Sequence, residues 1–210
     1  MQSVCPVVLV WCMIIYMKKK LKQALSLRPR HSISDDGLSQ SAVLVPVLCK
    51  DGLHQILFTK RSHQVVHHKG QVSFPGGMRH EDDKNLLETA IRETSEEIGL
   101  QKQDIEILGE LDDHVTVSSK FIISPFVGFI PYPYDFKISH GEIDELFCVP
   151  VPALLQLTDA IQEHQDIDGQ VFRTYSYDYD GRVIWGATAG ILHQLLDIWK
   201  AVSGAQDLNS

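Results

Sequence analysis

The segment GGMRHEDDKNLLETAIRETSEEIGL, from Gly76 to Leu100, decides the fold because it separates carboxylates from core-forming side chains on one helix. At about 100° per residue, Glu93, Glu96 and Glu97 fall in one arc. The neighbouring arc can face a core and holds Leu87, Ala90, Ile91, Thr94 and Ile98. The two arcs do not overlap, so the pattern predicts a helix that packs on one side and presents acids on the other.

Start and stop signals frame this helix. Asp82 or Asp83 can accept hydrogen bonds from the first free N–H groups, and Gly99 suits the left-handed position after the last turn. We therefore expect a helix from about Lys84 to Ile98.

The acidic stripe indicates a metal site. Like charges three and four residues apart on a helix each cost about 0.2–0.5 kcal/mol, and a divalent cation removes that cost. Mg²⁺ and Mn²⁺ favour carboxylate and water oxygens, and Mg²⁺ often shares its shell with substrate phosphates. The stripe thus predicts a metal held by Glu93, Glu96 and Glu97 and a phosphorylated substrate. The alternative is a solvated, Glu-rich helix face.

Two neighbouring features favour a binding site over a solvated face. Phe74-Pro75-Gly76-Gly77 leads into the helix through a loop whose backbone N–H groups can approach a ligand. Arg92 lies beside Glu96 on the helix wheel, where it can orient a carboxylate.

These residues resemble the Nudix box, in which a glycine and an acidic residue precede Arg-Glu-x-x-Glu-Glu-x-Gly. The matching residues are Gly77, Asp83, Arg92, Glu93, Glu96, Glu97 and Gly99. Asp83 stands where Glu is usual, and one extra residue separates it from Arg92. Both departures resemble the coenzyme A pyrophosphatase branch of the Nudix family.

A second signature upstream is similar to the same branch. It runs through Leu57-Phe58-Thr59-Lys60-Arg61-Ser62, then Gly70, then Phe74-Pro75-Gly76-Gly77. Val66 stands where a basic residue is expected, so His67, His68 or Lys69 would have to replace that phosphate contact. Together with Trp185-Gly186-x-Thr188-Ala189, the resemblance covers residues 42–202.

The resemblance implies an α/β/α sandwich with a mixed sheet and metal-dependent cleavage of a diphosphate linkage. For coenzyme A or its derivatives, the products would be 3′,5′-ADP and 4′-phosphopantetheine. One rival is a pyrophosphatase for another nucleoside diphosphate derivative, such as ADP-ribose or a nucleotide sugar. Another is a non-catalytic, nucleotide-binding Nudix module, against which the intact carboxylate set argues.

The resemblance also implies roles for single residues. The expected substrate-binding residues are Arg61, Lys69, Gly76 and Gly77; the metal ligands are Glu93, Glu96 and Glu97; the catalytic residues are Glu93, Glu142 and Arg92. The general base is either Glu93 or Glu142, and we prefer Glu142 to Glu145 as the acid that the late loop brings to the metal. An alternative role for Arg61 is to anchor its strand to a carboxylate.

Composition is consistent with a compact enzyme. The 210 residues are 44% hydrophobic and 22% charged, which suits one domain with extensions. The net charge of −8 argues against nonspecific nucleic-acid binding, which normally needs a basic face. The four cysteines, Cys5, Cys12, Cys49 and Cys148, show no metal-ligand spacing, so we expect free thiols and a cytoplasmic protein.

The N-terminus is apolar from Val4 to Met17 and then basic at Lys18–Lys20. This run is shorter than the about 20 residues that span a bilayer, and a signal peptide carries its positive charge before the apolar run. Three interpretations stay open: a membrane-associating segment within residues 4–20, an unusual leader, or translation that begins at Met17, which we favour. We expect a leader at 1–22, an irregular lead-in at 23–41, the Nudix domain at 42–203 and a tail at 204–210.

The remaining pattern predicts strands and one more helix. Strands are expected at Ala42–Leu48, Gln55–Lys60, Ile105–Leu111, Phe121–Ile130 and Leu146–Val149. A hairpin is expected from Gln170–Tyr179 and Arg182–Trp185, and a helix at Gly186–Val202. Trp185, Trp199 and Phe126 are expected in the core.

Overall fold

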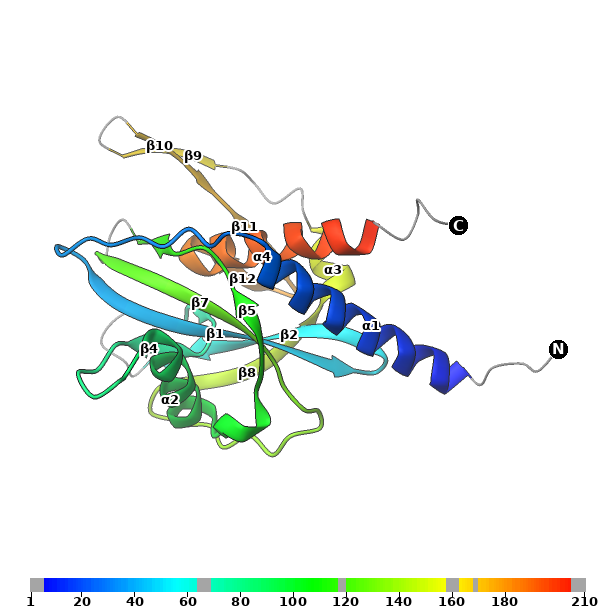
Figure 1. Ribbon diagram of the computed structural model, residues 1–210. Coiled ribbons are helices and arrows are strands. Elements are labelled where there is room, and N and C mark those ends of the chain that lie inside the picture. Colours follow the sequence, from blue (N-terminus) through cyan, green and yellow to red (C-terminus); the bar gives the residue numbers. More distant parts are fainter. Residues whose placement is uncertain (1–5, 64–68, 117–119, 158–162, 168–169, 205–210) are drawn as a thin grey trace.

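A mixed sheet separates one helix from three others in the computed structural model of the chain (Figure 1), which describes residues 6–63, 69–116, 120–157, 163–167 and 170–204. Helix α2 (Leu86–Ile98) lies on one face. The other face is covered by α1 (Pro6–Leu27), α3 (Val151–Gln156) and α4 (Gly186–Gly204). The expected α/β/α sandwich is therefore present.

Within the described residues, the main sheet has eight strands. They are β1 (Ser39–Lys50), β2 (Leu53–Arg61), β3 (Val72–Ser73), β4 (Gly76–Met78), β5 (Glu106–Glu110), β6 (His114–Val115), β7 (Phe121–Phe129) and β8 (Ile143–Pro150). Strands β1 and β7 pair in parallel, whereas β2, β4 and β5 pair antiparallel with their neighbours. The sheet is mixed, and it contains all five predicted strands with slightly different bounds.

Two hairpins follow. They consist of β9 (Glu163–Ile167) with β10 (Gln170–Thr174), and β11 (Ser176–Tyr179) with β12 (Arg182–Trp185). The predicted turn at Asp180-Gly181 joins β11 to β12, and helix α4 begins where it was predicted. The prediction of one strand over residues 170–179 is wrong, because β10 ends at Thr174 and pairs with β9, a polar segment that sequence reasoning did not identify.

Strands β1 and β2 pair only near their hairpin and then diverge. The gap is filled by residues 72–78: β3 pairs with the end of β2, and β4 pairs with the start of β1. The Leu44 N–H donates to the Pro75 carbonyl at 2.9 Å, which fixes the segment between the two short strands. This arrangement places the glycine-rich segment at the point where the chain enters α2.

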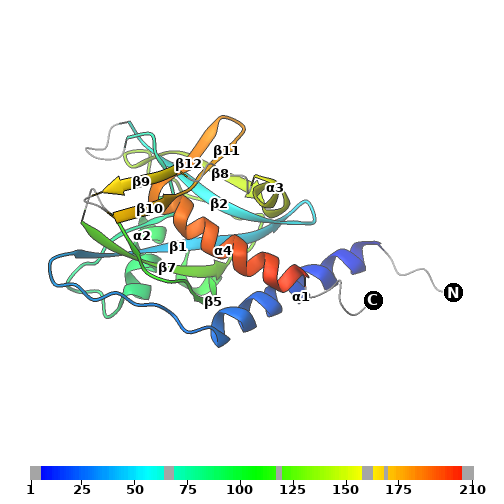
Figure 2. The same ribbon diagram turned by 90° about the horizontal axis from the view of Figure 1, so that it is seen from above.

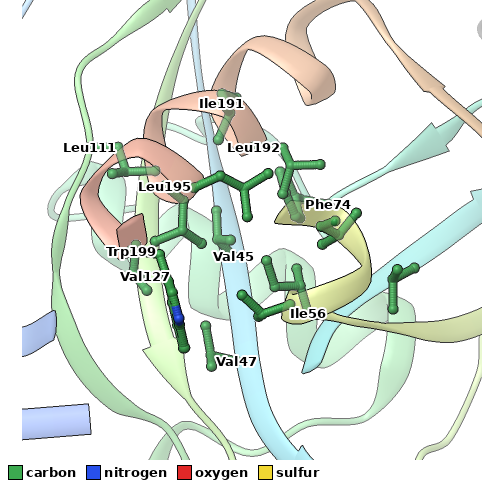
Figure 3. Close-up of a cluster of buried hydrophobic side chains, with 14 of the residues drawn as sticks. Val45, Val47, Ile56, Phe74, Leu111, Val127, Ile191, Leu192, Leu195 and Trp199 are labelled. Carbon is green, nitrogen blue, oxygen red and sulfur yellow. The ribbon is translucent and has the colours of Figure 1, made fainter. Parts of the chain in front are cut away.

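A separate hydrophobic core lies on each face of the sheet. On one face, Leu192, Leu195 and Trp199 of α4 pack on the sheet near Val45 and Ile56 (Figure 3). On the opposite face, α2 contributes buried apolar side chains to a cluster with the sheet: Ala42, Leu44, Leu48, Leu57, Ala90, Ile98, Leu100, Phe126 and Ile130. Burial of a large apolar side chain contributes about 1.5–3 kcal/mol, so these clusters fix the position of α2. The expected burial of Trp199 and Phe126 is confirmed.

Helix α1 was not predicted from the sequence, which indicated only an apolar and then basic leader. The expectation of irregular structure from residue 23 is wrong for residues 23–27, which continue the helix. Met17, Leu21 and Leu25 follow at four-residue spacing and are buried against the α4 side of the sheet. Figure 2 shows α1 beside α4 on this face. A translation start at Met17 stays a prediction, but Met17 itself belongs to the packed face of α1.

Ion pairs fasten α1 to the sheet as well. Lys18 and Lys22 contact the two carboxylate oxygens of Glu106 on β5 at 2.8 and 2.9 Å. The basic run that follows the apolar residues therefore has a partner within the domain. In the described part of the chain, no helix combines the length and hydropathy that crossing a membrane requires.

Candidate active site

Helix α2 begins two residues later than predicted because a different residue caps it. The Asn85 side chain accepts a hydrogen bond from the Glu88 N–H at 2.9 Å. Neither Asp82 nor Asp83 caps the helix. Gly99 ends α2 with φ 72°, as predicted, and its N–H donates to the Ser95 carbonyl at 2.9 Å.

Arg92 organises the acidic stripe. Its Nε and Nη2 donate to the two carboxylate oxygens of Asp83, each at 2.9 Å, in a fork geometry. Its Nη1 donates to Glu93 at 2.8 Å and to Glu96 at 3.2 Å, and Nη2 also reaches the Met78 carbonyl at 3.1 Å. All five N–H donors of a guanidinium can be used in this way. Arg92 therefore orients carboxylates, as its place on the helix wheel indicated.

Asp83 is held in place by several hydrogen bonds and in turn positions Arg92. It is buried, and besides Arg92 it accepts hydrogen bonds from the His80 N–H at 2.8 Å and the Thr89 hydroxyl at 2.9 Å. The Arg92 guanidinium holds the pKa of Asp83 well below its usual range. The acidic residue of the box thus acts through Arg92 rather than as a helix cap.

Glu97 is the most deeply buried acid of the stripe, with 3% of its side chain exposed. Its Oε2 accepts a hydrogen bond from the Gly76 N–H at 3.2 Å, and its Oε1 lies 3.9 Å from Nη1 of Arg61. Burial raises the pKa of Glu97 to about 8, and the nearby charges of Glu93 and Glu142 raise it as well, whereas the contacts with Gly76 and Arg61 lower it without compensating. Burial raises the pKa of Glu93 too.

The two glycines let strand β4 lie close to β1 at Gly76 and close to the Glu93 carboxylate at Gly77. A Cβ at Gly76, where φ is 149°, would lie 2.3 Å from the Ala42 carbonyl oxygen. A Cβ at Gly77 would lie 2.5 Å from Cδ of Glu93. The expected open loop is a paired strand, and the Gly76 N–H points at Glu97. A contact between Gly77 and substrate stays a prediction.

The acidic segment 139–145, which contains Glu142 and Glu145, lies next to the acidic stripe of α2. The Ser139 N–H donates to the Glu97 carbonyl at 2.8 Å, and the Ser62 N–H donates to the Glu142 carbonyl at 2.7 Å. The charge of Glu142 contributes to the raised pKa values of both Glu93 and Glu97. Glu145 instead pairs with Arg182 at 2.6 Å. This geometry favours Glu142 over Glu145 as the acid beside the stripe.

The donor chemistry of this site fits a hard divalent cation. The charges of Glu93 and Glu142 both act on the buried Glu97, and carboxylate oxygens are the ligands that Mg²⁺ and Mn²⁺ favour. Glu96 is more exposed and lies within reach of Arg92. Among the described residues, no three acidic, histidine or cysteine side chains lie close enough together to hold a metal ion in the arrangement that the structure shows.

The predicted substrate contacts are divided between two places. Arg61 faces Glu97, whereas Lys69 lines a separate cleft with Lys60, Arg182 and Trp185.

The prediction that Trp185 is in the core is wrong: 51% of it is exposed. Alternation along β12 could have shown this, because Ile184 is buried and its neighbours point the other way. The predicted roles of His67 and His68, and the departure at Val66, lie outside the described residues.

Comparison with known sequences shows the family. Residues 38–171 match the NUDIX domain. An uncharacterized Nudix hydrolase, NudL, from Photorhabdus laumondii subsp. laumondii is 35% identical over 171 residues, which cover 81% of this chain and 90% of the relative. NudL from Pectobacterium atrosepticum is 36% identical over 170 residues, covering 81% and 85%. The chain belongs to the Nudix family and is a pyrophosphohydrolase, a class that generally needs divalent metal ions.

Solved structures agree on the fold. An Ap4A hydrolase from C. elegans, in a binary complex, superimposes with a TM-score of 0.52 at 16% identity, covering 80% of this chain and 99% of that one. A MutT protein from Methanosarcina mazei Go1 gives 0.50 at 16% identity, covering 82% and 99%. The mixed α/β architecture described above is the Nudix fold.

Proposed function

We propose that this Nudix hydrolase cleaves the diphosphate linkage of coenzyme A or its derivatives, with Mg²⁺ or Mn²⁺ as cofactor, and releases 3′,5′-ADP and 4′-phosphopantetheine. The proposed catalysis is supported mainly by the surroundings of the buried Glu97 carboxylate. This carboxylate contacts the backbone of β4 and the guanidinium of Arg61, and the charges of Glu93 and Glu142 lie near it. The substrate assignment is supported by the upstream signature, since the end of β2, all of β3 and the start of β4 lie within it and β4 borders the carboxylates.

In the proposed mechanism, Glu93, Glu96 and Glu97 would hold the metal. When bound, the cation would stabilise negative charge on the diphosphate and make a water more acidic. Arg92 sets the orientation of Glu93 and Glu96, and Gly77 gives Glu93 room beside β4. A carboxylate then takes the proton of the attacking water, which contributes roughly 10²–10⁴-fold. Glu142 is our choice for this base, with Glu93 as the alternative.

Arg61 is proposed to contact the diphosphate itself. Its Nη1 lies 3.9 Å from Glu97, and its Nε is buried without a hydrogen-bond partner among the described residues. A buried donor without a partner costs about 1–3 kcal/mol, and a phosphate oxygen at the metal site would satisfy it. This position suits an arginine that acts on the group common to all substrates better than one that recognises the 3′-phosphate.

We therefore expect Arg61→Ala to lower kcat/KM for coenzyme A and for 3′-dephospho-coenzyme A by the same factor, roughly tenfold or more. Arg61→Lys should recover only part of the loss, because Lys lacks the planar fork. Steady-state kinetics on both substrates measure this. A loss confined to coenzyme A would instead assign Arg61 to the 3′-phosphate.

The proposed function is tested by a turnover assay with Mg²⁺ or Mn²⁺ on coenzyme A, acetyl-coenzyme A, ADP-ribose and NADH. Coenzyme A or its acyl form should give the highest kcat/KM, with 3′,5′-ADP as product and no turnover after chelation. Equal efficiency on ADP-ribose would remove the coenzyme A assignment and leave a metal-dependent Nudix pyrophosphatase. Nucleotide binding without turnover of any substrate would indicate a non-catalytic module.

A further inference from the structure

A second cleft lies between the start of β3 and the β11–β12 hairpin. It is lined by Lys60, Lys69–Val72, Gly181–Val183 and Trp185, and its volume is about 400 Å³. We refer to it as the hairpin cleft. None of its lining residues belongs to the acidic stripe, so it requires its own explanation.

The hairpin cleft contains positive charge that the described protein does not neutralise. Arg182 is compensated, since it pairs with Glu145 at 2.6 Å and with Asp180 at 3.2 Å. Lys60 and Lys69 have no carboxylate within ion-pair distance among the described residues. The undescribed residues 64–68, next to Lys69 in the chain, include no acidic residue. In a chain of net charge −8, two ammonium groups in one cleft that have no carboxylate partner among the described side chains indicate an anionic ligand.

An aromatic surface lies beside these charges. Strand alternation turns Val183 and Trp185 away from the core, and 46% and 51% of these residues are exposed. A half-exposed indole at a cleft offers a flat apolar face on which a nucleobase can stack, and such stacking tolerates any base. Stacking together with ammonium groups suits a nucleotide better than a simple anion.

The hairpin cleft is connected to the active site through the backbone of Arg61. The Gly70 N–H donates to the Arg61 carbonyl at 3.1 Å, and the Arg61 N–H donates to the Gln71 carbonyl at 2.9 Å. Lys60 lines the cleft, whereas the next residue, Arg61, faces Glu97, and the pairing of β2 with β8 is irregular between these two residues. The two sites therefore lie on either side of the end of β2. A ligand that reaches both carries two separate anionic groups, as coenzyme A does on its ribose.

We propose that the hairpin cleft binds the nucleotide end of the substrate, with Trp185 stacked on the adenine and Lys60 and Lys69 in contact with the 3′-phosphate. This assignment rests on the proposed function, since it takes coenzyme A as the substrate. Arg182 also lines the hairpin cleft, and its position is fixed by the ion pair with Glu145 and by the Phe147 ring, whose centroid lies 5.0 Å from the guanidinium. The cleft thus determines specificity, and the acidic stripe performs the reaction.

Binding of 3′,5′-ADP tests the proposal without any need for turnover. Calorimetry with Mg²⁺ present would compare wild type with Trp185→Ala, Lys60→Met and Lys69→Met. We expect about tenfold weaker binding for Trp185→Ala, and Trp185→Phe should retain most of the affinity. The lysine variants should lose the wild-type preference for 3′,5′-ADP over 5′-AMP. Lys200→Met, at an exposed position on α4, is the matched control and should bind as wild type does.

Kinetics separate this proposal from the proposed function. The lysine variants should raise KM for coenzyme A with little change in kcat and leave 3′-dephospho-coenzyme A unaffected. Because Lys69 lies outside the strands, Lys69→Met keeps the test valid if Lys60→Met does not fold. Wild-type affinity and KM in all three cleft variants, in an enzyme that does hydrolyse coenzyme A, would overturn the cleft assignment alone. Cleft-dependent binding of 3′,5′-ADP by an enzyme that prefers ADP-ribose would support the cleft and remove the coenzyme A function.

Discussion

Glu97→Gln is expected to abolish hydrolysis while the fold persists. The substitution keeps the shape of the side chain and removes the charge that we propose binds the metal. We expect turnover to fall at least about 100-fold, the upper range for loss of a residue that merely supports a ligand. Because burial and the charges of Glu93 and Glu142 already disfavour the ionised form of Glu97, the neutral amide should leave the melting temperature without metal unchanged or slightly raised.

Two measurements check this expectation. Turnover is measured at saturating Mg²⁺ and Mn²⁺, and thermal melting is followed without metal. Glu81→Gln removes an exposed acid from the segment before α2 and should leave both quantities unchanged. Near wild-type turnover of Glu97→Gln at saturating metal would show that Glu97 is not a ligand.

The parts of the site that sequence predicted are those set by local periodicity. The spacing of Glu93, Glu96 and Glu97 and the left-handed Gly99 are properties of one helix, and the helix forms as expected. The N-cap prediction failed for a non-local reason. Asp83 satisfies the local rule for a cap, but Arg92, nine residues further along, forms a two-point ion pair with it and leaves Asn85 to cap.

The remaining differences arise from packing between distant segments. The N-terminal segment was interpreted as a leader because the partners of helix α1, which are β5 and α4, are encoded far away in the sequence. Trp185 was assigned to the core on its residue type, although only the register of β12 decides which side chains point inward. The same holds for Arg61, since neither its type nor its neighbours in sequence show that it faces Glu97.

Arg92→Ala is expected to damage both stability and catalysis. Its loss leaves Asp83 buried without its strongest partner, and the free energy of unfolding should fall by about 1–3 kcal/mol. Glu93 and Glu96 also lose the group that orients them, so we expect turnover and metal affinity to fall roughly 10–100-fold. Urea denaturation, steady-state kinetics and a Mn²⁺ titration measure these three quantities.

Arg92→Lys distinguishes charge from geometry. A lysine keeps the positive charge near Asp83 but has no planar fork with which to hold Asp83 while it also reaches Glu93 and Glu96. We therefore expect Arg92→Lys to recover part of the stability and little of the turnover. In a double-mutant cycle with Asp83→Asn, the two sites should show a coupling energy in stability, because their side chains form one ion pair. Wild-type turnover in Arg92→Lys would contradict the positioning role, since charge alone would then suffice to prepare the carboxylates for metal.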